Sequence, residues 1–254
     1  MLGETSSELR PVKRPATMRR ARWDAPLVLD TVELRWFVAG SLPAEVGVWF
    51  TGSTGVLEER SDTYRLDGRG DIGVKRRFGE TLELKVRRSP DGRIEFGDGL
   101  AGSLEVWRRW SPADVLVEHG ADERWVDVHK SVVKRRFLSV GTEVAYSSIV
   151  EATGVGCDVE VAAVTLGEVN WWTFAFAAFG PPTTRRAALL ASWKALVSAA
   201  PCPEPFEPRT ARAMGYPEWL TLCTRSRTRS LRRAGSPDHR ESSASSAVMS
   251  TRVG

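Results

Sequence analysis

The chain has 254 residues, of which 42% are hydrophobic and ten are Trp, which excludes a disordered polymer and a peptide too small to form a core. Its net charge of +4 lies at its ends, because residues 1–22 and 224–254 carry +4 and +5 and leave −5 for residues 23–223. A core with that balance argues against specific recognition of nucleic acid, and no apolar run is long enough to cross a bilayer as a helix.

Both ends of the chain are polar and poor in apolar residues. We predict that residues 1–22 form a disordered basic N-terminal tail and that residues 224–254 form a disordered basic C-terminal tail rich in Ser and Arg. Residues 23–223 show no internal repeat and no linker, so we expect one folded domain. Flexible basic tails touch anionic polymers weakly, which leaves open an interaction protein that acts through its tails and uses the domain as a non-catalytic scaffold.

The domain begins with a strand whose two faces differ. Residues 29–38 place Val32, Leu34, Trp36 and Val38 on one face and Thr31, Glu33, Arg35 and Phe37 on the other. Residues 41–50 form a turn or a short helix. Further strands are predicted at residues 62–66, 73–78, 81–88, 93–96, 103–110, 124–137, 142–150, 157–167 and 170–180. Turn sequences such as "SPDG" separate them at short intervals, so eight to ten antiparallel strands are expected, enough to close a barrel or fill two sheets.

Two helices are predicted after the strands. In residues 184–200, Leu189, Trp193 and Leu196 recur at helical spacing, and Pro201 ends the run. Residues 216–223 suit a short final helix with Pro217 near its start.

Common catalytic and cofactor motifs are missing or misplaced. The matches to GxGxxG at residues 68–73 and 97–102 precede charged strands rather than helices, so we interpret them as hairpin turns and expect no organic cofactor. Cys157, Cys202 and Cys223 are far apart, as are the three histidines, which argues against a disulfide framework or a thiolate zinc site. Free thiols without a secretory signal predict a cytoplasmic protein.

Charged residues of both signs alternate along several predicted strands. The pattern has two readings, a solvated sheet face or the polar interior of a barrel that binds a multiply charged ligand. Cations neutralise phosphate oxygens, and carboxylates hold a hard ion such as Mg²⁺ or Mn²⁺, so the inventory suits phosphoryl chemistry without a covalent nucleophile.

The order and character of these strands resemble the CYTH superfamily, which contains the triphosphate tunnel metalloenzymes. The similarity runs over residues 27–223 and rests on "VELRWF", "DIGVKRRFGETLELKVRR", "VVKRRF", "CDVEVAAV" and "WWTFAFAAFG". The resemblance implies an α+β fold with a mostly antiparallel, closed or nearly closed β-barrel, a tunnel, and peripheral helices. The first-strand signature of that superfamily is ExExK, and the matching positions here are Thr31, Glu33 and Arg35.

The resemblance also implies roles for individual residues. The expected ligand is a small anion bearing a triphosphate or polyphosphate, with Mg²⁺ or Mn²⁺ as the metal and metal-dependent phosphohydrolysis as the activity. Phosphate binding is expected from Arg35, Lys75, Arg77, Lys85, Arg87, Lys134 and Arg136, metal binding from Glu33, Asp158 and Glu160, and a further tunnel-lining role from Glu83. Because Thr31 replaces the first carboxylate of the signature, a binding module without turnover is the alternative.

Overall fold

A computed structural model describes residues 27–52, 56–77, 81–111, 124–140, 143–147 and 154–234. The strands in this part of the chain are β1 (Leu27–Ala39), β2 (Val56–Arg65), β3 (Ile72–Arg77), β4 (Thr81–Gly97), β5 (Leu100–Ser111), β6 (Trp125–Val140), β7 (Glu143–Ser147), β8 (Gly156–Leu166) and β9 (Val169–Phe179). The helices are α1 (Ala44–Thr51), α2 (Pro182–Ala199), the 3₁₀ turn η1 (Glu207–Arg209) and α3 (Tyr216–Ala234). None of these helices has the length and apolar character needed to cross a membrane.

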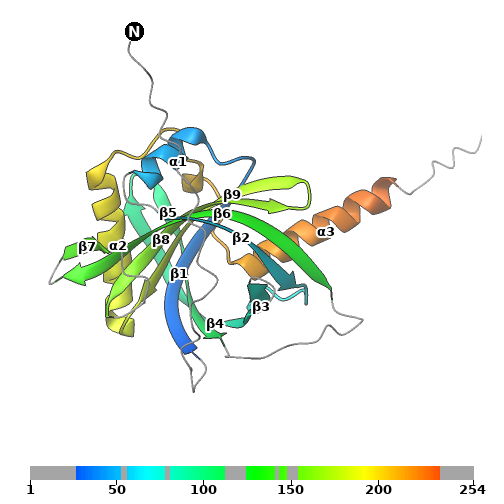
Figure 1. Ribbon diagram of the computed structural model, residues 1–254, viewed down its shortest axis with the longest axis horizontal. Helices are drawn as coiled ribbons and strands as arrows, with labels where there is room; N and C mark the ends of the chain where they lie inside the picture. Colours follow the sequence, from blue (N-terminus) through cyan, green and yellow to red (C-terminus); the bar gives the residue numbers. More distant parts are fainter. Residues whose placement is uncertain are drawn as a thin grey trace, which may run out of the picture. The chain divides into compact units, whose positions relative to one another are not determined.

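Eight of the strands close into a ring. The order β2-β3-β4-β5-β1-β9-β8-β6 returns to β2, because β2 also pairs with β6, and β7 extends the free edge of β6 (Figure 1). All neighbouring strands are antiparallel. The closed antiparallel barrel with peripheral helices that the sequence predicts is therefore confirmed. We call the space enclosed by the eight strands the lumen.

The hydrophobic core lies outside the ring, between the barrel and its helices. Leu34 and Trp36 of β1 and Phe174 of β9 are at most 2% exposed and belong to the same cluster as Phe50 of α1 and Trp193 of α2. The rings of Trp36 and Phe174 stack with centroids 5.9 Å apart, and Trp193 meets Phe174 edge-on at 6.0 Å. Side chains alternate along a strand. Because these residues are buried under the helices, the polar residues between them point into the lumen.

The chain divides into two units after Thr221. Residues Leu222–Ala234 continue α3, so the final helix extends eleven residues beyond the predicted boundary at residue 223, into the segment expected to be a tail. The tail predicted at residues 1–22 lies outside the described residues. Cys157, Cys202 and Cys223 are free thiols, as expected.

Candidate functional site

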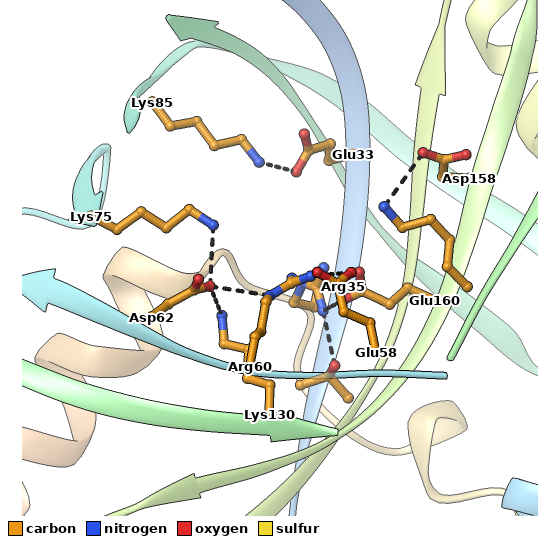
Figure 2. A network of polar contacts seen from close by, with 12 residues as sticks. Glu33, Arg35, Glu58, Arg60, Asp62, Lys75, Lys85, Lys130, Asp158 and Glu160 are labelled. Atoms are coloured by element: carbon orange, nitrogen blue, oxygen red, sulfur yellow. Dashed lines mark hydrogen bonds and ion pairs between the residues drawn. The ribbon is translucent and has the colours of Figure 1, made fainter. Parts of the chain in front are cut away.

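The lumen-facing positions of the ring are charged on nearly every strand. The register pairs Glu33 and Arg35 of β1 with Ala177 and Ala175 of β9, which have small side chains. Side chains from several strands converge on the lumen (Figure 2). Of the two interpretations of the alternation, a solvated sheet face or the polar interior of a barrel, the arrangement corresponds to the second.

Glu33 and Arg35 form two separate ion pairs on the β1 wall. Glu33 accepts hydrogen bonds from Thr31 Oγ1 at 2.5 Å and from Lys85 Nζ. Burial opposes the charge of Glu33, but Lys85 and the two hydrogen bonds outweigh it, so the pKa of Glu33 lies below its ordinary value. Arg35 donates to Glu160 Oε1 and to Thr173 Oγ1, both at 2.8 Å.

A second group surrounds the fully buried carboxylate of Asp62 on β2. Its Oδ2 lies 2.8 Å from Lys130 Nζ, 3.2 Å from Lys75 Nζ and 3.6 Å from Arg60 Nε, and its Oδ1 lies 3.8 Å from Arg77 Nε. Glu83 completes the group, with its Oε2 at 2.9 Å from Lys75 and 3.5 Å from Arg77. We call these six residues the Asp62 cluster. Three of its cations, Lys75, Arg77 and Lys130, share the two carboxylates, and the fourth, Arg60, also donates to Glu58 Oε2 at 2.9 Å.

The pKa values within the Asp62 cluster reflect burial first and the neighbouring charges second. Burial raises the pKa of Glu83, but Lys75 and Arg77 outweigh it and bring the pKa to about 2. The pKa of Lys75 is lowered, first by burial and then by the neighbouring Arg77. The pKa of Lys130 lies well below its ordinary value, first because of burial and then because of Lys75. Burial is thus the main cause that lowers the pKa of both lysines, a neighbouring cation adds to it, and an added anion would favour their charged forms.

Two further groups of ion-paired residues lie on other strands of the ring. Arg136 of β6 holds Asp158 of β8 with two hydrogen bonds, of 2.6 and 2.7 Å, and Lys134 lies 3.8 Å from the same carboxylate. Arg87 of β4 pairs with Glu105 of β5 and lies 3.9 Å from Glu218 of α3.

The structure thus places the predicted site residues at several separate positions around the lumen. Lys75, Arg77 and Glu83 share one cluster, Arg35 pairs with Glu160, and Lys85 pairs with Glu33. Arg87 stands apart from these, beside α3. The three carboxylates predicted to bind metal, Glu33, Asp158 and Glu160, are each neutralised by a different cation. Among the residues that the structure describes, no three His, Cys, Asp or Glu side chains gather in a way that could hold a metal ion. As arranged, these carboxylates do not fit a metal site.

Sequence reasoning missed four lumen residues, Arg60, Asp62, Tyr64 and Lys130. Asp62 and Tyr64 lie within the predicted strand 62–66 and Lys130 within the predicted strand 124–137, whereas Arg60 precedes the first of these strands. Residues 56–62, "VLEERSD", begin β2 and carry polar side chains on both faces, so the alternation through Arg60 and Asp62 is not apparent from the sequence. The signal that could have found them is the same period of two, extended upstream from residue 62.

Comparisons with known proteins add little to this geometry. No protein-family model matches the sequence, and no curated protein matches it. Among solved structures, the chain is similar to the PH1819 protein from Pyrococcus horikoshii OT3, with 12% identity and a TM-score of 0.37, over 79% of this chain and 99% of that one. A match of this kind carries no argument about family or function.

Proposed function

We propose that the lumen binds a small ligand with several phosphate groups, without requiring turnover. The observation that carries this proposal is the Asp62 cluster, where Arg60, Lys75, Arg77 and Lys130 face three carboxylates, those of Asp62, Glu83 and Glu58, inside a closed barrel. Buried cations in excess attract an anion, and phosphate oxygens accept the charge-assisted hydrogen bonds that Lys and Arg donate.

The carboxylates of the lumen act as internal counterions in this proposal. Each of Glu33, Asp62, Glu83 and Glu160 has a lowered pKa, so all four are ionised at neutral pH and hold the cations in place. A phosphate that enters exchanges some of these ion pairs for its own. Each exchange returns little net free energy, and a ligand with several linked phosphates gains from many exchanges at once.

Accessible cations give the ligand its first contacts. The side chains of Lys134, Lys85 and Arg77 are 42%, 34% and 28% exposed, whereas those of Lys130 and Asp62 are 2% and 0% exposed. The proposed path therefore leads from partly exposed cations to the buried Asp62 cluster, and electrostatic attraction along such a path favours multiply charged anions.

The resemblance to the CYTH superfamily supports the same proposal. The closed antiparallel barrel is the architecture that the resemblance implies. Glu33 matches the second residue of the ExExK signature, and Arg35 stands in place of its Lys. Membership of that superfamily is part of the proposal. Metal-dependent hydrolysis remains a prediction. It is not part of the proposed function, because the carboxylates of the described residues do not gather around a common point.

The test is calorimetric titration of the full chain with inorganic tripolyphosphate in the presence of a chelator. Lys75→Gln and Arg77→Gln should each weaken binding by about tenfold, the effect of one lost hydrogen bond to a charged group. Arg93→Gln is the matched control, because the Arg93 side chain is 65% exposed and pairs with the exposed Glu95. Absence of binding, or equal losses in the control, would overturn the proposal.

Interaction through the basic tails is the alternative function. Its residues lie outside the described part of the chain except for residues 224–234, and no observation on the barrel favours it. Tripolyphosphate binding that depends on residues 1–22 and not on Lys75 would favour it.

A further inference from the structure

We infer that the lumen is closed at the end where α3 begins, so that it admits a phosphate chain only by a free terminus. The inference rests on the proposed function and narrows its ligand class. It predicts that linear phosphate chains with at least one uncapped end bind, whereas chains capped at both ends do not.

The closure is made by residues Gly215–Leu220, which we call the floor. Trp219 is 1% exposed and stacks on Phe37 of β1, with centroids 4.6 Å apart and planes 8° apart, and it meets Trp171 of β9 edge-on at 5.9 Å. Tyr216 stacks on Tyr64 of β2 at 5.5 Å. Large aromatic rings packed this closely leave no passage for a hydrated phosphate.

The floor contacts nearly the whole ring. Its partners come from seven of the eight ring strands, namely Phe37 (β1), Tyr64 (β2), Gly73 (β3), Arg87 (β4), Trp107 (β5), Lys130 (β6) and Trp171 (β9). Two of these contacts leave little room for a side chain: a Cβ at Gly73 would lie 3.1 Å from Pro217, and a Cβ at Gly215 would lie 2.9 Å from Trp107. The floor therefore fits into the end of the ring rather than resting outside it.

Cations of the lumen rest directly on the floor. Lys130 Nζ lies 3.9 Å from the centroid of the Tyr216 ring, and the Arg35 guanidinium lies 4.9 Å from it. Cation–π contacts of this kind hold the two cations at the closed end, where each is also paired with a carboxylate, Lys130 with Asp62 and Arg35 with Glu160. The terminal phosphate, the most highly charged part of a linear chain, would meet them there.

The floor and its neighbourhood also keep unused donors. The Tyr216 hydroxyl and the Nε of Arg60, whose side chain is 6% exposed, are buried without a hydrogen-bond partner in the described residues. Burial is the main cause that raises the pKa of Tyr216, so its hydroxyl remains a donor at neutral pH. Buried donors without acceptors are uncommon, and the oxygens of a terminal phosphate would satisfy them.

The experiment compares three ligands on the full chain by calorimetry, in the presence of a chelator. They are inorganic tripolyphosphate, with two free ends; a nucleoside triphosphate, with one; and a dinucleoside tetraphosphate, with none. The last two carry about the same charge, so a difference between them reports the chain end. We expect the doubly capped ligand to bind on the order of a hundredfold more weakly than the nucleoside triphosphate, because it loses several charge-assisted hydrogen bonds at the floor.

Tyr216→Phe gives a second, independent measurement. The substitution removes one hydrogen-bond donor and keeps the aromatic stack. It should therefore weaken binding of the nucleoside triphosphate and leave the residual binding of the doubly capped ligand unchanged. Equal affinity for the two capped ligands overturns the closed lumen alone. Failure of tripolyphosphate to bind overturns the proposed function, and this inference with it.

Discussion

Lys130 and Asp62 form an ion pair that is closed off from water inside the barrel. Lys130 Nζ donates to Asp62 Oδ2 at 2.8 Å and to the Tyr64 hydroxyl at 2.6 Å, and the two charged side chains are 2% and 0% exposed. An isolated charge of either sign would be strongly unfavourable at that depth, so each residue depends on the other. The pair therefore links the stability of the barrel to the charge balance of its lumen.

Asp62→Asn should be strongly destabilising. The change leaves Lys130, Lys75 and Arg60 without their shared carboxylate, and removing one partner of a buried pair costs about 3–5 kcal/mol. Urea unfolding at neutral pH measures the loss. Asp71→Asn is the matched control, because Asp71 pairs with Arg69 on the surface, and its unfolding midpoint should stay unchanged. Equal midpoints for the two variants would show that the Asp62 cluster does not hold the barrel together.

Stability should fall in acid through the lumen carboxylates. The pKa of Glu83 drops from its ordinary 4.5 to about 2 in the folded protein. Between these values the unfolded chain binds more protons than the folded one, so the contribution of Glu83 is fully present above pH 4.5 and is lost as the pH falls towards 2. A shift of this size corresponds to about 3 kcal/mol.

Unfolding free energies measured from pH 6 down to about pH 2 would test this linkage. Glu83→Gln should flatten that part of the profile, because the variant has no proton to bind at this position. Glu95→Gln, which changes an exposed carboxylate, should keep the slope of the parent protein. A profile for Glu83→Gln as steep as that of the parent would place the acid sensitivity elsewhere.

The packing of the floor predicts a second stability effect. Trp219→Ala removes a ring that is 1% exposed and stacked on Phe37, and it should cost about 3–5 kcal/mol, as for other buried aromatic truncations. Leu190→Ala on α2 is the control, because Leu190 is 39% exposed, and it should change stability by about 0.5 kcal/mol or less. Thermal unfolding of both variants measures the difference. Similar losses would mean that the floor is not packed into the ring.

The antiparallel strands could be predicted from the sequence because they obey a strict alternation, and the resemblance to the CYTH superfamily implied that they close into a barrel. The apolar face of residues 29–38 contains Leu34 and Trp36, which indeed pack against α1 and α2, and the opposite face contains Glu33 and Arg35, which line the lumen. The 3.6-residue period of Leu189, Trp193 and Leu196 likewise gave α2 within two residues of its start. The hydrophobic periodicity of a strand or helix with one buried face shows which of its residues pack against the rest of the protein.

The arrangement of the site could be predicted only in part, because it depends on which strands meet. Alternation places Lys75, Lys85 and Glu33 on inner faces, but pairing Lys85 with Glu33 depends on the curvature of the ring. The floor left no pattern, since Tyr216 and Trp219 read as ordinary residues of a short amphipathic helix. Only the closed barrel reveals that they fill its end.

Thr31→Glu tests whether the β1 wall is one carboxylate short of a metal site. Thr31 and Glu33 lie on the same face of β1, about 7 Å apart along the strand, and the Thr31 hydroxyl already reaches Glu33 Oε1 at 2.5 Å. The substitution therefore places two carboxylates side by side, which repel one another without metal and can hold Mn²⁺ together with a phosphate. In the variant, Mn²⁺ should strengthen tripolyphosphate binding by about tenfold over the chelated sample, and phosphate release should rise from a low baseline. Thr31→Gln introduces a side chain similar in size to Glu but without its charge, and it should show neither change. If Mn²⁺ leaves binding and phosphate release by Thr31→Glu unaltered, the wall around Glu33 is not a degenerate metal site, and binding without turnover is the better description of the barrel.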